Sequence, residues 1–178
     1  MKFNSLTLLA FLLLSSTLPS TIFAQNACDK SLVTQKVKEV CTTIATTGEI
    51  PNIKFDCGGL NYVWVHQEID DKTIVFLSHP TLERFKKDFP ADNKWGHNVY
   101  ALADKSTDEK KNMIMQIVNA PVKDKKVGKD GVGEGHWAGS YYWLKPGAAN
   151  PGKKISYVMS CKNSKTNEVL VAGAGIWE

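Results

Sequence analysis

Apolar residues recur along the chain with two spacings, and each spacing predicts one kind of element. Between Asp29 and Thr47 they return every three or four positions, which predicts a helix that Gly48 ends in the left-handed conformation. Elsewhere, aromatic and β-branched residues gather in short runs bounded by turn residues, which is typical of strands. These runs predict five strands, at 60–68, 73–78, 136–144, 155–161 and 169–177.

The segment between the second and third strands is less regular. Residues 80–103 are irregular, with prolines, a glycine and aromatic residues. Ser106 to Glu109 then has the form of a capping box, in which the serine hydroxyl and the glutamate carboxylate satisfy backbone amides, and this predicts a helix to about Asn119. A basic, glycine-rich loop is expected at 122–135.

This order of elements predicts an α+β domain with one antiparallel sheet, because the helices are grouped between the second and third strands. In the first strand, Val63 and Val65 point to one side of the sheet. Tyr62 and Trp64 point to the other side, so both faces require cover. We expect a long N-terminal helix on one face and a helical and loop cap, residues 80–120, on the other.

The beginning of the chain differs from the rest. Lys2 precedes an apolar run at 6–14, and a small residue precedes the expected cleavage before Gln25. Residues 1–24 therefore read as a secretory signal peptide, and 25–178 as a single domain. The apolar run is about half of the ~20 residues that a spanning helix needs, which disfavours a membrane anchor. We expect no membrane span in the mature chain and a periplasmic or extracellular location.

Four cysteines lie in the expected mature part: Cys28, Cys41, Cys57 and Cys161. An even number in an exported chain favours two disulfide bonds over free thiols. A zinc site or a c-type haem would need closely spaced cysteines, and no C-x-x-C pair is present. The spacing alone leaves all three pairings open.

Composition and charge narrow the class of protein. The 178 residues include 22 Lys and Arg against 18 Asp and Glu, a net charge of +4. That excess is too small and too dispersed for a nucleic-acid interface. With 43% hydrophobic residues, the chain is expected to fold as a globular domain.

The polar residues form no recognisable catalytic motif. None of the four histidines lies in a metal-ligand spacing such as H-E-x-x-H, and no G-x-S-x-G turn is present. Ser78 and His79 are neighbours on an expected strand, so their side chains point to opposite faces and cannot act as a pair. An enzyme is therefore disfavoured, and we expect neither a cofactor nor a metal.

Four segments carry recognisable motifs: S-H-P at 78–80, Y-Y-W-L-K-P-G at 141–147, K-I-S-Y-V at 154–158 and V-A-G-A-G-I-W at 171–177. In this order they resemble the A-H-P, Y-x-W-x-K-P-G, K-x-S-Y-V and V-x-G-x-G-I-Y segments of the single Cache family of PAS-like extracellular sensor domains. The resemblance covers roughly 29–178 and is close only at 137–177. The cysteines depart from the family pattern, and its G-K-N-x-x-D stretch is not recognisable in 82–98. Cache domains are usually the sensor ends of receptors, and this chain resembles a free-standing secreted version.

The resemblance implies a module that binds a small molecule and catalyses nothing. The ligand expected is a short organic acid or an amino-acid-like metabolite. Ligand contacts are expected from His79, Lys94, Trp95, Tyr142, Trp143, Lys145 and Tyr157. In this view Lys145 and His79 hold a polar head between aromatic walls. The alternatives are that the aromatic residues are core, that Lys145 is a solvated turn residue and that His79 is a capping or core residue.

The strand order 2-1-5-4-3 of PAS-like domains ranks the disulfide pairings. Cys41 lies one to two turns before the end of the helix, where the first strand begins, and so near Cys57. Cys28 and Cys161 would both lie at the opposite edge of the sheet. We therefore expect the pairs Cys41–Cys57 and Cys28–Cys161.

A second function remains open, that of a secreted interaction protein that uses the Cache fold as a ligand-free scaffold. Its candidate feature is the basic loop at 123–129, although charge runs are more often solvated loops. The expected partners are thus a small-molecule ligand and, among proteins, a membrane receptor or a host protein.

Overall fold

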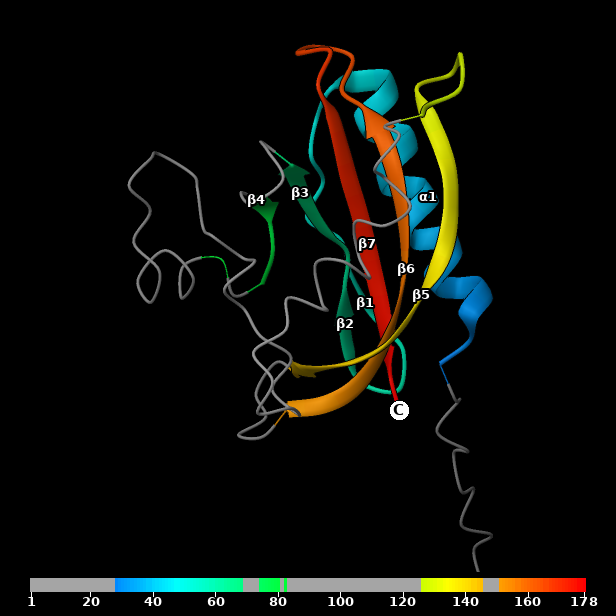
Figure 1. The fold of residues 1–178 in the computed structure, drawn as a ribbon, viewed down its shortest axis with the longest axis vertical. Coiled ribbons are helices and arrows are strands. Elements are labelled where there is room, and N and C mark those ends of the chain that lie inside the picture. The colour runs from blue at the N-terminus through cyan, green and yellow to red at the C-terminus, as the bar shows by residue number, and fades with distance from the viewer. Residues whose placement is uncertain (1–27, 69–73, 81, 83–125, 146–150) are drawn as a thin grey trace, which may run out of the picture.

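The computed structural model describes residues 28–68, 74–80, 82, 126–145 and 151–178. These residues form one helix and seven strands (Figure 1). The elements are α1 (Lys30–Thr47), β1 (Lys54–Asp56), β2 (Leu60–Tyr62), β3 (Trp64–Glu68), β4 (Ile74–Ser78), β5 (Val132–Leu144), β6 (Pro151–Lys162) and β7 (Val169–Trp177).

Five of the strands form one antiparallel sheet in the order β4-β3-β7-β6-β5. This order confirms the expected α+β class and the expected strand order. The C-terminal strand β7 lies in the middle, between β3 and β6. Residues 170–173 of β7 pair with β3 on one side and β6 on the other, and the close packing of the sheet depends on the sequence of this strand.

Capping residues define the ends of α1. The Asp29 side chain accepts a hydrogen bond from the Ser31 amide at 2.9 Å. Gly48 adopts the left-handed conformation, with φ of 70°, and its amide donates to the carbonyl of Ile44 at 3.0 Å. The helix has 18 residues and begins at Lys30. The expectation of a long N-terminal helix is therefore corrected to a five-turn helix that lies after the first 29 residues.

The helix packs on one face of the sheet, along β5, β6 and β7 (Figure 1). Its buried residues recur at helical spacing: Val33, Val37, Val40, Cys41 and Ile44. They form one buried cluster with Val65, Met159, Leu170, Ala172 and Ala174 of the sheet and with Val63, between β2 and β3. The small alanines of the central strand let the helix lie close to it. We call this side of the sheet the helix face.

The expected first strand, 60–68, is divided at Val63. Its first part, β2, turns away to pair with β1 in a separate two-stranded sheet, and its second part, β3, joins the main sheet. The Val63 amide donates to the carbonyl of Ile53 at 3.0 Å. The hairpin turns at Gly58 and Gly59, which have φ of 70° and 122°, a region that glycine reaches without strain.

Strands β5 and β6 begin four residues earlier than expected, at Val132 and Pro151. The expectation assigned the glycines of 128–135 to a loop. Gly135 instead lies in β5 opposite Met159, where a side chain would collide with the Tyr157 ring. The glycine is therefore a packing requirement of the strand.

Two disulfide bonds connect Cys28 to Cys57 and Cys41 to Cys161, with Cα–Cα distances of 4.5 and 5.2 Å. The expected pairs, Cys41–Cys57 and Cys28–Cys161, are wrong. The described residues contain no free cysteine. Both bonds connect the helix segment to strands, but at different ends from those expected.

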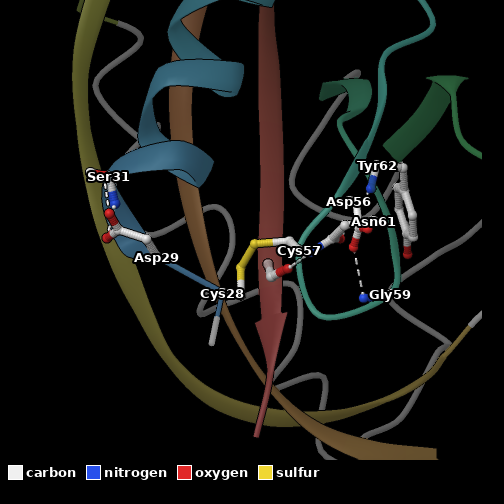
Figure 2. The surroundings of a disulfide bond; sticks show 9 residues. Cys28, Asp29, Ser31, Asp56, Cys57, Gly59, Asn61 and Tyr62 are labelled. Carbon is white, nitrogen blue, oxygen red and sulfur yellow. Dashed lines mark hydrogen bonds between the residues drawn. A yellow bond between two sulfur atoms is a disulfide. The ribbon is translucent and has the colours of Figure 1, made fainter. Parts of the chain in front are cut away.

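The path of the chain after α1 explains this correction. Residues 49–57 run back along the helix towards its first turn, where Cys57 meets Cys28 (Figures 1 and 2). The expected pairing placed Cys57 near the last turns of α1. The turn between β6 and β7 lies at the C-terminal end of α1 instead, where Asn163 Nδ2 donates a hydrogen bond to the carbonyl of Gly48 at 3.1 Å. Cys161 thereby reaches Cys41.

Several expectations lie outside the described residues. These are the signal peptide, the cap expected at 80–120 except for residues 80 and 82, and the helix at 106–119. In the part of the chain that the structure describes, no helix is long and apolar enough to cross a membrane.

Candidate functional site

The face of the sheet opposite α1 combines aromatic rings with buried polar groups. Strand alternation brings to this side every second residue of β3, β6 and β7, joined by residues from β2, β4 and β5. We call it the aromatic face, formed by Tyr62, Trp64, His66, Phe76, His79, Tyr141, Trp143, Lys154, Ser156 and Trp177.

Lys154 lies at the centre of this face with 1% of its surface exposed. Its ammonium is 4.9 Å from the ring centres of Tyr62 and Trp64, and 4.7 Å from that of Trp177. Such contacts attract a cation to the negative face of a ring. None of the ion pairs among the described residues includes Lys154. Burial lowers the pKa of Lys154 to about 7.

Two glycines of β7 create the space that Lys154 and its neighbours occupy. A side chain at Gly173 would collide with the Trp64 ring, and one at Gly175 would collide with the Lys154 side chain. Between them, Ala172 and Ala174 face the helix. The A-G-A-G run in β7 thus leaves room for α1 on one face and for large rings on the other.

His79 follows β4 and contacts rings from three elements. Its ring centre is 4.9 Å from those of Tyr62 and Phe76 and 6.2 Å from that of Trp143. Burial, and then the nearby Lys154 and His66, lowers the pKa of His79 well below its usual range. At neutral pH His79 is therefore uncharged and can act as a hydrogen-bond donor or acceptor.

Hydroxyl groups of β5 and β6 lie beside Lys154. The Tyr141 and Ser156 hydroxyl oxygens are 2.6 Å apart, and both side chains are buried. Tyr141 is the register partner of Lys154. Burial raises the pKa of Tyr141 and of Tyr62 above the usual tyrosine value, so both phenols stay protonated at neutral pH.

One hydrogen-bond donor on this face has no acceptor. Trp177 Nε1 is buried and has no hydrogen-bond partner among the described residues. By contrast, the Trp64 indole donates to His66 Nδ1 at 3.2 Å. A buried N–H without an acceptor destabilises the fold, so the unpaired indole N–H of Trp177 requires an explanation.

The structure brings together two of the expected ligand residues, His79 and Trp143. Tyr157 lies on the helix face, where it contacts Trp137 at a ring-centre distance of 5.6 Å. Tyr142 is 36% exposed and is not part of the aromatic face. Lys145 lies near the turn at Gly59. Lys94 and Trp95 lie outside the described residues.

Sequence reasoning missed Lys154, the most central charged group of this face. It placed Lys154 just before an expected strand at 155–161, where a lysine is usually solvated. The available signal was the K-x-S alternation, which puts Lys154 and Ser156 on one side of β6. Its burial, however, depends on rings supplied by other strands.

No protein-family model, no curated protein and no solved structure matches this chain. Among the described residues, no group of three or more His, Cys, Asp or Glu side chains could hold a metal ion.

Proposed function

We propose that this chain is an exported, single Cache-like sensor module that binds a short organic acid or an amino-acid-like metabolite and catalyses no reaction. The observation that carries this proposal is Lys154, a buried lysine without an acidic partner among the described residues. A buried unpaired ammonium is costly to the fold, and ionisable groups perturbed in this way cluster at functional sites.

A carboxylate ligand would supply the negative charge that Lys154 lacks among the described residues. Its negative charge pairs with the ammonium in surroundings where the interaction is poorly screened by water. The aromatic rings around Lys154 provide apolar walls for the remainder of a small ligand. The neutral Tyr141 hydroxyl is a further donor beside Lys154.

The strand order supports the Cache-like part of the proposal. The sheet order β4-β3-β7-β6-β5 is the one that the resemblance implies. Two of the four Cache-like segments, 154–158 and 171–177, are neighbours in β6 and β7. Lys154 lies where they meet, as the register partner of Trp177.

Two observations support export. Two disulfide bonds fit an oxidising compartment such as the periplasm or the cell exterior. The pattern of residues 1–24 is that of a signal peptide.

Thermal unfolding of the oxidised exported protein against short organic acids, amino acids and amines tests the proposal. A ligand at 100 times its Kd adds about 2.7 kcal/mol, which raises the midpoint by roughly 5–10 °C for a chain of this size. We expect a shift with at least one acid. Lys154→Met should abolish it, and Lys153→Met, the exposed neighbour, should keep it.

The absence of a shift with every compound of the panel would overturn the proposal. The secreted interaction protein would then be favoured. Its candidate loop at 123–129 lies partly outside the described residues, with Lys126 and Lys129 exposed.

A further inference from the structure

Strand β5 forms one edge of the main sheet and is the longest of the described strands (Figure 1). In the part of the chain that the structure describes, β6 pairs with its inner side and no strand pairs with its outer side. Its 13 residues include one charged residue, Glu134, and no proline. Proteins usually protect an edge with lysine, proline or a very short strand, and the opposite edge strand β4 has only 5 residues. The outer side of β5 is therefore a candidate for pairing with another strand.

A bulge in the middle of β5 decides which strand can pair with it. Ala138 lies opposite Ser156 of β6. Tyr141 lies opposite Lys154, so between these two pairs β5 has one residue more than β6. The extra residue reverses the alternation of backbone donors and acceptors along the outer side of β5. A regular strand that matched one half of β5 would therefore be out of phase with the other half.

A second copy of β5 matches this interruption when it runs antiparallel to the first. If Gly139 of one copy lies opposite Ser140 of the other, each strand has the same number of residues between Ala138 and the tyrosine after the bulge. Neither strand is then bulged relative to the other, and the backbone groups stay in phase on both sides of the axis. Each side chain also faces one that points to the same side of the sheet.

This register brings aromatic side chains together across the two copies. Trp137 of one copy lies opposite Tyr142 of the other, and both side chains point away from the aromatic face, as their register partners Tyr157 and Lys153 do. Tyr142 is 36% exposed, and among the described residues only Leu60 is a comparably exposed large hydrophobic residue. Aromatic pairs of this kind stabilise antiparallel sheets, and the contact covers the exposed ring.

The charges at the two ends of β5 are complementary in the same register. Glu134, which is exposed, lies opposite Lys145 of the second copy, and the symmetry repeats the pair at the other end. None of the ion pairs among the described residues includes Glu134 or Lys145. Parallel pairing in register would instead place each charged residue beside its own copy. The charges therefore favour the antiparallel order.

We propose that two copies of this chain pair through the outer sides of their β5 strands, about a two-fold axis between Gly139 and Ser140, and join their two five-stranded sheets into one. This axis is perpendicular to the sheet, so both aromatic faces lie on one side and both helices on the other. Strands β5 and β6 curve together and remain paired through the curve, so the second copy shares it (Figure 1). The dimer goes beyond the proposed function and does not depend on a ligand.

Sedimentation equilibrium of the oxidised exported protein between about 1 and 100 µM tests this dimer, because a small interface should dissociate within that range. We expect twice the monomer mass at the highest concentration and a fall towards the monomer mass on dilution. A monomer at every concentration would overturn the proposal.

Gly139→Lys tests the position of the axis. Apart from its chain neighbours, nothing lies within 4 Å of a Cβ at Gly139, so the monomer accommodates a side chain there. In the dimer the symmetry brings two lysine ammonium groups together at the axis, and the Kd should rise at least about tenfold. Gly139→Ala adds a Cβ without a charge and should leave the Kd within about threefold. A Gly139→Lys protein that dimerises like the wild type would overturn this interface.

A charge exchange tests the register. Glu134→Lys places like charges at both ends of the interface and should raise the Kd about tenfold. The double variant Glu134→Lys/Lys145→Glu restores opposite charges and should return the Kd to within about threefold of the wild type. Glu168→Lys is the matched control, because Glu168 is exposed in the turn between β6 and β7, and should leave the Kd unchanged. A double variant as weak as Glu134→Lys would overturn the antiparallel register.

Discussion

The two faces of the sheet are made from alternate residues of the same strands, yet their chemistry is opposite. The helix face is built mainly from aliphatic and small side chains, with Tyr157 and Trp137 among them, and carries both disulfide bonds on or beside its helix. The aromatic face buries a lysine, histidines and hydroxyl groups among large rings. The helix face can therefore account for stability, whereas the aromatic face buries polar groups at a cost, as binding sites do.

Two consecutive lysines show the contrast within one strand. Lys153 is exposed, and its ion pair with Glu178 at 2.7 Å raises the pKa of the Lys153 ammonium. Lys154 points to the opposite side, where burial lowers its pKa to about 7. The same residue type thus serves as a surface group or as a site group according to the strand alternation.

The largest expected effect is loss of the Cys41–Cys161 bond on the helix face. The double variant Cys41→Ala/Cys161→Ala should lose about 5 kcal/mol in the chain-entropy model, because the bond spans 120 residues. The bond between Cys28 and Cys57 spans 29 residues and should contribute about 3.5 kcal/mol. Urea unfolding of the two double variants measures the difference. Equal losses, or a larger loss for the shorter loop, would contradict this ranking.

The next effect tests packing on the same face. Ile44 is fully buried, so Ile44→Ala should lower the free energy of unfolding by about 3 kcal/mol through the cavity that it leaves. Lys38 lies on the exposed side of α1, and Lys38→Ala should change the free energy of unfolding by less than about 0.5 kcal/mol. Chemical denaturation measures this free energy for both variants. Similar values for both variants would show that the helix does not form the core described above.

The aromatic face should reveal its buried lysine through pH. Between pH 7 and 10 the unfolded chain keeps Lys154 protonated, whereas the folded chain, with a pKa of about 7, releases the proton. The unfolded state then binds more protons, so stability should rise with pH, by at most about 1.4 kcal/mol per unit. Below pH 7 Lys154 is charged in both states, so the cost of burying its charge lowers the stability in full. This cost disappears as the pH rises through the window.

Unfolding curves at pH 7.5 and 8.5 measure this slope largely apart from the neighbouring groups. The lowered pKa of His79 acts at lower pH, and the raised pKa values of Tyr62 and Tyr141 act at higher pH. Lys154→Met should remove the rise. A variant with the same slope as the wild type would assign the pH dependence to other groups.

The smallest expected effect belongs to the exposed lysine. Lys153→Met removes a surface ion pair and should change the free energy of unfolding by less than about 0.5 kcal/mol. Its pH slope between 7.5 and 8.5 should equal that of the wild type. A large change in the free energy of unfolding of Lys153→Met would contradict the distinction between the exposed lysine and the buried one.

Helix α1 and the sheet strands could be predicted because their apolar periods differ clearly, and the order of the strands was implied by the resemblance to PAS-like domains. The break at Val63 could not, since the run around it is apolar on both sides and hides the change of partner from β1 to β7. The disulfide pairing failed because the spacing of cysteines does not record that residues 49–57 run back along the helix.

The candidate site was predicted less well than the fold. His79 and Trp143 could be expected from the resemblance, and both lie on the aromatic face. Lys154 could not, because its environment comes from rings on other strands and from the space left by Gly173 and Gly175. Burial of a polar group is a property of the assembled sheet and not of its own segment.

The most direct test of the binding site is a carbon NMR titration of the lysine Cε signals, with Lys154 assigned from the spectrum of Lys154→Met. In the free protein the Lys154 signal should titrate near pH 7, far below the signal of Lys153. Saturating propionate should raise that pKa by at least about one unit, because a carboxylate beside the ammonium favours its charged form. A Lys154 signal that titrates near the usual lysine value, and that propionate leaves unchanged, would contradict the account.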